Sequence, residues 1–164
     1  MVAIGKRSRI GVCNICGVRG PLTEDHVPPK GSVTITQMEM FNICDAMFAH
    51  RPEKKGKLFQ SGIKFKSLCS KCNNDYLGAR YDPSINQLSK DLADIVKTPI
   101  AVPPVASISV QINRVCRAVL GHLMAVGLDK YNDGEMANSC REYFLNSEIK
   151  EPQKCKNLLL GIPI

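Results

Sequence analysis

The alternation of apolar and polar residues in the first half of the chain predicts short strands joined by turns and helices. Residues 22–27 follow a Gly-Pro turn, and residues 63–68 alternate apolar and polar side chains, so both segments are expected to be strands. Helical spacing predicts helices at 36–50 and from 70 to about 80, and Asp82-Pro83 is expected to end the second one. This half therefore has the pattern of a small α+β unit.

The second half of the chain has mainly helical spacing and is expected to be a separate unit. The predicted elements are helices at 84–96, 115–126 and 134–144, and strands at 105–110 and 158–164, with a Pro-rich hinge at 98–104. We expect residues 1–83 to form one domain and residues 84–164 a mixed α/β extension that senses a signal or drives self-assembly. The sequence stops on an apolar run, which suggests the front part of a longer protein or a strand that pairs across an oligomer.

Positive charge is concentrated in the first half. The 164 residues carry a formal net charge of +7; residues 1–82 hold 13 Lys and Arg against 7 Asp and Glu, and residues 83–164 hold 9 against 8. Such a basic half is either a solvated face or a surface for an anionic partner, of which nucleic acid is the commonest. Because no apolar run approaches the ~20 residues that cross a bilayer, no membrane partner is expected.

The cysteines provide the strongest chemical signal in the sequence. No apolar segment follows the basic start, so the protein is expected to be cytoplasmic, where clustered cysteines hold metal more often than they form disulfides. Two Cys-x-x-Cys turns, Cys13/Cys16 and Cys69/Cys72, together supply a tetrahedral set of four thiolates, which predicts a shared structural zinc. The remaining cysteines lack ligand spacing and are expected to be small buried residues; they are Cys44, Cys116, Cys140 and Cys155.

Three polar residues near these turns are candidates for catalysis. Asp25 and His26 are neighbours on a predicted strand, so their side chains are expected on opposite faces. Asn73 directly follows the second turn, so a zinc ion would fix its position. A carboxylate and an amide oxygen suit Mg²⁺, and a neutral imidazole can take a proton near pH 7. The alternatives are that Asp25 caps a turn, His26 is a surface residue and Asn73 is a helix N-cap.

Cys-x-x-Cys, then Asp-His-x-x-Pro, then Cys-x-x-Cys-Asn resembles the pattern of zinc-stapled HNH endonucleases. The resemblance covers about residues 11–82 and is nearest to the variant of phage junction-resolving endonucleases and of bacterial HNH proteins linked to phage defence. It implies an α+β fold of the ββα-metal class with a structural zinc, followed by the mixed extension. The middle Asn of the family, which usually stands a few residues before the second turn, is absent from residues 63–67.

The resemblance also implies an activity and a role for each candidate residue. The activity is hydrolysis of a DNA phosphodiester bond. Asp25 and Asn73 would hold a catalytic Mg²⁺ or Mn²⁺, and His26 would be the general base that activates water. The alternative is a catalytically inactive zinc module that binds nucleic acid or a protein, and only Asp25, His26 and Asn73 distinguish the two.

The expected partner is DNA, bound through its backbone and shape because no base-reading element is evident. Basic residues that could contact phosphates, or could simply be solvated, are Lys54, Lys55, Lys57, Lys64, Lys66, Lys71 and Arg80. Cutting both strands would need a homodimer or two events. The other two histidines have less specific surroundings: His122 lies on an apolar helix and is expected in the core or an interface, and His50 precedes the basic loop.

Overall fold

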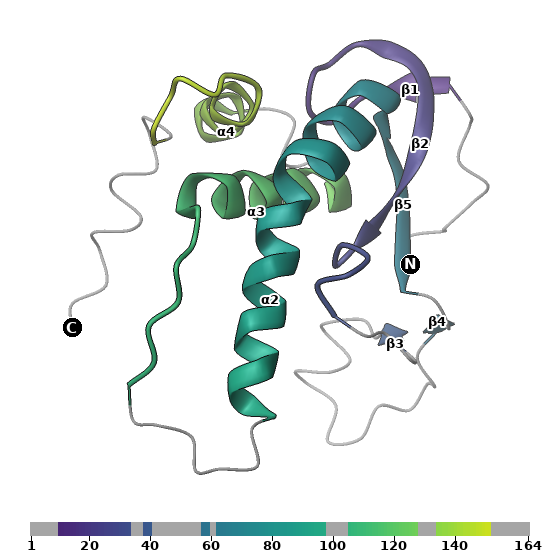
Figure 1. Ribbon diagram of the computed structural model, residues 1–164. Helices are drawn as coiled ribbons and strands as arrows, with labels where there is room; N and C mark the ends of the chain where they lie inside the picture. Colours follow the sequence, from purple (N-terminus) through teal and green to yellow (C-terminus); the bar gives the residue numbers. More distant parts are fainter. Residues whose placement is uncertain are drawn as a thin grey trace, which may run out of the picture.

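The computed structural model describes residues 10–33, 38–40, 57–59, 62–97, 105–127 and 134–151, which form a mixed α+β arrangement (Figure 1). Its strands are β1 (Ile10–Val12), β2 (Arg19–Val27), β3 (Met38–Met40), β4 (Lys57–Phe59) and β5 (Ile63–Cys69). Its helices are η1 (Lys71–Tyr81), α2 (Asp82–Val96), α3 (Ile112–Val126) and α4 (Glu135–Leu145). Within these residues, no helix has the length and apolar character needed to cross a membrane.

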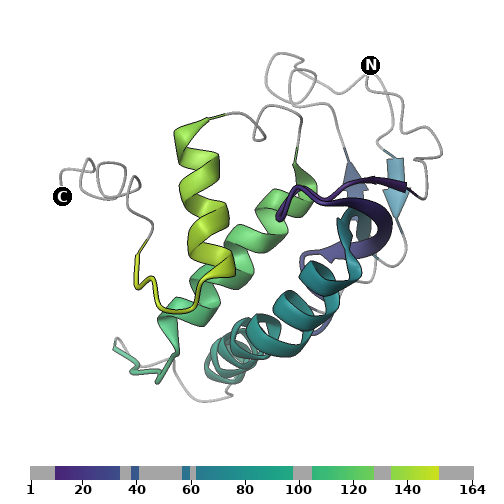
Figure 2. The same cartoon turned by 90° about the horizontal axis from the view of Figure 1, so that it is seen from above.

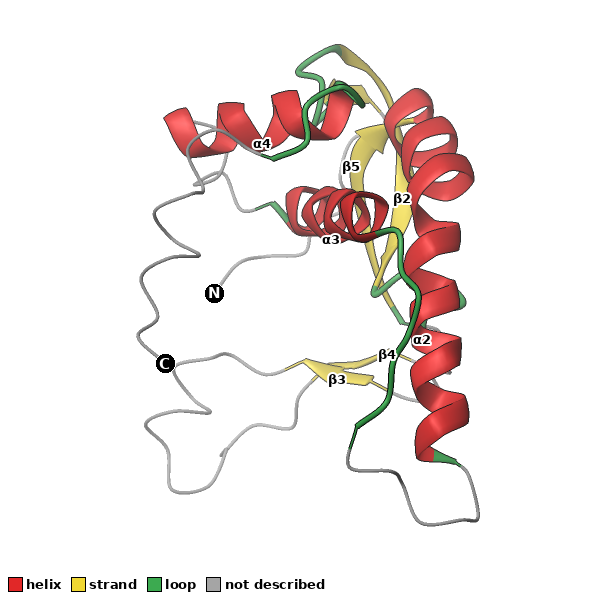
Figure 3. Ribbon diagram, turned by 60° about the vertical axis from the view of Figure 1, so that its left-hand side comes forward, coloured by secondary structure: helices red, strands yellow, loops and turns green. Residues whose placement is uncertain are grey.

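The central element is an antiparallel sheet in the order β1-β2-β5. Both long strands contain the segments predicted from alternation, and β2 begins three residues earlier than expected. Its pairing with β5 shifts between Thr23 and Glu24, so the sheet is irregular immediately before Asp25. The short pair β3–β4 forms a second sheet that lies apart from the first (Figure 3).

A continuous run of helix follows β5, and Pro83 does not end it. The π-helical turns of η1 pass directly into α2, where Pro83 occupies the first turn. A proline is accommodated there because the first N–H groups of an α-helix have no partner within the helix. The helix expected from 70 to about 80 is η1, which ends at Tyr81, and the helix expected at 84–96 follows it without a break as α2.

Two other expected elements differ in the structure. Met38–Met40, inside the helix predicted at 36–50, is a strand paired with Lys57–Phe59, so pairing with a distant segment outweighs helical spacing. Residues 105–110 are not a strand, and no strand among the described residues pairs with them. The strand expected at 158–164 lies outside the described residues.

Helix α3 joins the second half of the chain to the first. It contacts η1, β2 and β5 and lies between α4 and the η1–α2 run (Figure 2). One apolar cluster contains Leu68 and Leu77 from the first half and Ala118 and Phe144 from the second. A Cβ added to Gly121 would lie 2.5 Å from side-chain atoms of Leu77 and of Phe144, so glycine permits this close approach. The two parts expected on either side of residue 83 thus share one core among the described residues.

Two hydrogen bonds to the end of α3 fix its position against the sheet. The buried Ser67 hydroxyl of β5 donates to the Ala125 carbonyl at 2.6 Å, and Asn14 Nδ2 donates to the Met124 carbonyl at 2.9 Å. Because both acceptors follow His122 by two or three residues, these bonds restrict where that imidazole can lie. Nearer the start of α3, the buried Arg117 Nε donates to the Tyr143 carbonyl at 2.9 Å and links α3 to α4.

Candidate functional site

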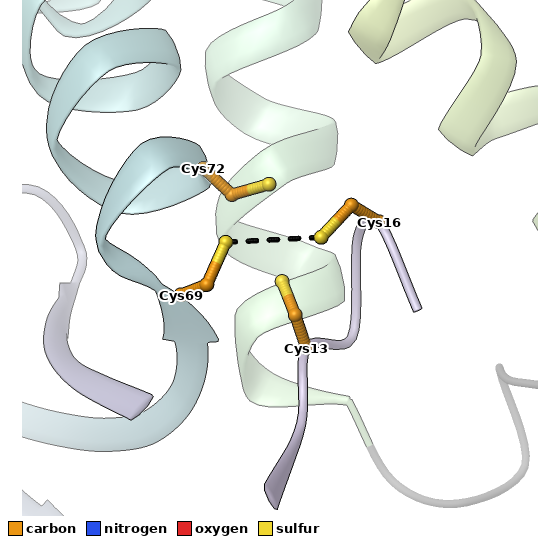
Figure 4. A group of neighbouring side chains, drawn as sticks. All are labelled: Cys13, Cys16, Cys69 and Cys72. Atoms are coloured by element: carbon orange, nitrogen blue, oxygen red, sulfur yellow. Dashed lines mark hydrogen bonds between the residues drawn. The ribbon is translucent and has the colours of Figure 1, made fainter. Parts of the chain in front are cut away.

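The four cysteines of the two Cys-x-x-Cys turns converge in space, and we call them the cysteine cluster (Figure 4). All four Sγ atoms lie within 4.8 Å of one another, and the Cys16 and Cys69 Sγ atoms are 3.7 Å apart. Gly17, at φ +72°, completes the first turn and donates its N–H to the Cys13 carbonyl. Glycine adopts this left-handed backbone readily. The cluster therefore gathers ligands from β5, the start of η1 and the loop between β1 and β2.

Hydrogen bonds and burial shift the pKa values of three thiols in the cysteine cluster. Cys13 accepts a hydrogen bond from the Cys72 thiol, which lowers the pKa of Cys13 to about 4. The same bond raises the pKa of Cys72, and burial raises the pKa of Cys16. Four thiolates cannot ionise together at this spacing unless positive charge compensates their repulsion. Soft sulfur donors in a set of four suit zinc, so the cluster could hold a structural zinc ion, as the sequence predicted.

Strand β2 places Asp25 and His26 on opposite faces of the sheet, as expected. The Asp25 side chain is buried at 5% exposure and is opposite Phe65 of β5, whereas His26 is half-buried and opposite Lys64. We call the side of Asp25 the inner face and the side of His26 the outer face. The two neighbours therefore have different surroundings.

On the inner face, Asp25 belongs to a hydrogen-bonded chain of three side chains. Asp25 Oδ2 lies 2.8 Å from His122 Nδ1, and His122 Nε2 lies 2.9 Å from Asp82 Oδ1. His122 is only 4% exposed. Burial lowers the pKa of His122, but its bonds to Asp25 and Asp82 outweigh burial and raise the pKa to about 9. At neutral pH the ring is therefore an imidazolium that donates to both carboxylates, and we call the three residues the Asp25–His122–Asp82 chain.

Sequence reasoning missed this role of His122. The prediction of a core or interface position is correct for its burial, but the two acidic partners were not expected. They stand 97 and 40 residues away along the chain. The single available signal was a histidine on an otherwise apolar helix face, which indicates that a buried polar partner must exist but does not identify it.

Asn73 braces strand β2 next to Asp25. Its Nδ2 donates to Thr23 Oγ1 at 2.9 Å and to the Glu24 carbonyl at 3.0 Å. Because Asn73 lies inside η1, whose N-cap is Ser70, the alternative N-cap role is wrong. No hydrogen bond joins Asn73 to Asp25 in the described part of the chain.

Asp25 and Asn73 each carry an oxygen atom of the type that hard divalent cations bind. Neither the Asn73 amide oxygen nor Asp25 Oδ1 has a hydrogen-bond partner among the described residues. Carboxylate and amide oxygens are ligands that Mg²⁺ and Mn²⁺ take, with water completing the coordination. The donor chemistry of Asp25 and Asn73 therefore suits the predicted cation.

On the outer face, the surroundings of His26 keep its imidazole neutral. Desolvation lowers the pKa of His26, and the positive charges of Lys64 and Lys30 lower it further. Lys64 is also 3.8 Å from the exposed Glu24 carboxylate. A neutral, half-buried imidazole retains a lone pair that can accept a proton.

The predicted phosphate-binding residues are distributed unevenly around His26. In the β2–β5 register, Lys64 is opposite His26 and Lys66 is opposite Glu24. Lys71 and Arg80 are exposed near the two ends of η1, and the Arg80 guanidinium lies 5.1 Å from the centre of the Tyr76 ring. Lys57 begins β4, and Lys54 and Lys55 lie outside the described residues.

The remaining candidates are the other cysteines and His50. Cys116 and Cys140 are half-buried rather than fully buried as expected. Cys44, Cys155 and His50 lie outside the described residues. In comparisons with protein-family models, curated proteins and solved structures, nothing matches this chain. A functional assignment therefore depends on the chemistry of the site.

Proposed function

We propose that the protein is a metal-dependent HNH endonuclease that hydrolyses DNA phosphodiester bonds. One observation carries the proposal: an antiparallel strand pair leads through the cysteine cluster into a helix, and Asn73 of that helix is hydrogen-bonded beside Asp25 and His26. This is the order of elements in a ββα nuclease site. The clustered thiols support a structural zinc, which would fix the start of η1 and the Asn73 side chain with it.

His26 is the proposed general base. Its lowered pKa favours the neutral form, which can take a proton from water as the oxygen attacks phosphorus. Its position opposite Lys64 supports this role because the attacked phosphate would lie next to a positive charge. A positioned base of this kind contributes about 10²–10⁴-fold to a hydrolysis rate.

Asp25 and Asn73 are the proposed protein ligands of a Mg²⁺ or Mn²⁺ ion. Their oxygens that have no hydrogen-bond partner among the described residues have the right chemistry, and Asn73 is already anchored to the backbone next to Asp25. When bound, such an ion supplies positive charge that stabilises the extra negative charge of phosphoryl transfer. The role of the protein is to hold these two oxygens in place while His26 handles the proton.

A second candidate function is a zinc module that binds nucleic acid or protein without cutting it. The observation that favours it is the burial of Asp25, whose carboxylate already has a partner in His122. In this alternative, the cysteine cluster and the basic residues would be retained, and the Asp25–His122–Asp82 chain would serve only to pack α3 on the sheet.

Plasmid cleavage separates the two functions. Zinc-loaded protein is incubated with supercoiled plasmid with and without Mg²⁺ or Mn²⁺, alongside His26→Ala and Asn73→Ala. We expect metal-dependent cleavage, about 10²–10⁴-fold slower in His26→Ala at unchanged zinc content. Asn74→Ala is the matched control, because Asn74 is exposed and its side chain is hydrogen-bonded to Ser70, the N-cap of the same helix; it should cut like the wild type.

Two results would contradict the nuclease assignment. Cleavage by His26→Ala at the wild-type rate would remove the general base from the mechanism. Retention of DNA by the wild type and by both variants, with no cleavage under any metal condition, would establish the binding module instead.

A further inference from the structure

The second half of the chain contributes a buried polar group to the inner face of the sheet. His122 of α3 lies between Asp25 of β2 and Asp82 at the start of α2, with both ring nitrogens within 2.9 Å of a carboxylate oxygen. Packing alone does not require such a group, because an apolar side chain of similar size is often at least as stable as a buried ion pair. The arrangement therefore calls for a reason beyond packing.

The hydrogen bonds of His122 divide the two oxygens of Asp25 between different tasks. His122 Nδ1 engages Oδ2, and Oδ1 has no hydrogen-bond partner among the described residues. Asp82 engages the other ring nitrogen and thereby fixes how the imidazole is turned. Carboxylates that bind metals are commonly held in this way by hydrogen bonds from residues that do not contact the metal themselves.

The position of the ring is itself fixed by the packing of α3. Gly121 allows the helix to approach Leu77, and Ser67 and Asn14 bind carbonyls of the turn that follows His122. Three contacts from three different segments therefore hold the imidazole against Asp25. A side chain restrained to this degree can set the orientation of its partner.

We propose that His122 is a positioning residue for the catalytic cation: together with Asp82 it orients the Asp25 carboxylate so that Oδ1 is presented to the metal. The inference rests on the proposed nuclease function and extends it, because it makes helices α2 and α3 part of the site. Residues beyond 83 then matter for metal binding, whatever else they do.

The test measures Mn²⁺ binding directly. Free Mn²⁺ is followed by electron paramagnetic resonance during titration of the zinc-loaded full chain, and plasmid cleavage is measured over the same Mn²⁺ range. We expect His122→Phe to weaken Mn²⁺ binding about 10–100-fold, which is the usual effect of losing a residue that is hydrogen-bonded to a metal ligand. At saturating Mn²⁺ the cleavage rate should recover most of its wild-type value, because the chemistry of His26 is unchanged.

A second pair of variants keeps the test decisive if His122→Phe does not fold. Asp82→Ala removes the acceptor for His122 Nε2 and should weaken Mn²⁺ binding, whereas Asp82→Asn keeps an oxygen there and should restore most of the affinity. Asp91→Ala on the same helix is the control, since the Asp91 carboxylate accepts a hydrogen bond from Gln87 rather than from His122; this variant should bind Mn²⁺ like the wild type. A purely structural role would affect melting temperature and zinc content rather than this order of Mn²⁺ affinities.

The possible failures are distinguishable. If the wild type binds Mn²⁺ and cuts, and His122→Phe or Asp82→Ala does so with unchanged affinity, the positioning role is overturned and the nuclease stands. An equal loss of Mn²⁺ affinity in Asp82→Ala and Asp91→Ala also overturns it, because any lost negative charge on α2 would then have the same effect. A wild type that neither binds Mn²⁺ nor cuts overturns both proposals together.

Discussion

The cysteine cluster and the Asp25–His122–Asp82 chain are two buried polar groups that reach charge balance in opposite ways. The cluster gathers four thiols and no positive side chain, and it could hold an added cation. The Asp25–His122–Asp82 chain places one imidazolium between two carboxylates, so its own positive charge balances most of its negative charge. The comparison teaches that the first group should depend on metal and the second on pH.

The two groups also connect the molecule differently. The cluster joins the loop after β1 to the end of β5 and the first turn of η1, where Cys72 lies. The Asp25–His122–Asp82 chain joins the sheet to α2 and α3. Loss of the first should therefore disturb the sheet and η1, whereas loss of the second should loosen α3 from a sheet that survives.

The largest expected effect follows from removal of zinc. Structural zinc sites contribute about 10–16 kcal/mol of apparent binding free energy in small domains, and Cys13 and Cys72 belong to the apolar core. We expect a chelator, or Cys72→Ser, to unfold the sheet and η1 at 25 °C, seen as loss of β-sheet amide signals in NMR spectra. The control is Cys116→Ser on α3, outside the cluster, which should retain one zinc per chain and the native spectrum.

Survival of the native spectrum after complete zinc removal would show that the four thiols are held by packing alone. In that case the contrast between the two groups disappears, because neither would need an ion.

A smaller effect is expected from pH. The pKa of His122 is raised from 6.5 to about 9 in the folded protein, so its stabilising contribution is complete below pH 6.5 and is lost as pH rises through about 9. The shift corresponds to roughly 3 kcal/mol as an upper bound for a buried pair. Urea unfolding of zinc-loaded protein, without other divalent cations, should show the free energy of unfolding falling between pH 6.5 and 9.

His122→Gln isolates this contribution from other groups that titrate in the same range. The variant should be less stable than the wild type at pH 6.5, and the difference between the two should shrink toward pH 9. A difference in unfolding free energy that is constant across this range would mean that the imidazole is neutral. Hydrogen bonds between neutral and charged groups would then hold the Asp25–His122–Asp82 chain together.

The cysteine cluster and the long strands were predictable because their signals are local. A Cys-x-x-Cys turn fixes two ligands within four residues, and the alternation along residues 63–68 predicts a strand that β5 contains, although the adjacent Ser67 and Leu68 are both buried. The opposite facing of Asp25 and His26 follows from the same two-residue period. These features need no knowledge of what the chain packs against.

The partners of Asp25 and the path of the helices were not predictable, because distant contacts decide them. His122 meets Asp25 only after α3 has packed on the sheet, and Met38–Met40 becomes a strand only because Lys57–Phe59 is available to pair with it. The unbroken passage from η1 into α2 was not predictable, because the cost of Pro83 depends on whether it falls in the interior or the first turn of a helix.

The smallest expected effect lies on the outer face, where charge acts through solvent. Lys64→Gln removes a positive charge that lowers the pKa of His26, so that pKa should rise, as followed by NMR titration of the ring. Stability should change by less than about 1 kcal/mol, because the Lys64–Glu24 pair is exposed. If Lys64 contacts a phosphate, the slope of log affinity for DNA against log salt should fall by about 0.9.

Lys90→Gln on α2 is the control and should leave the pKa of His26 unchanged, since Lys90 is not among the charges that shift it. An unchanged His26 pKa in Lys64→Gln would show that the charge of Lys64 does not contribute to the lowered pKa of His26.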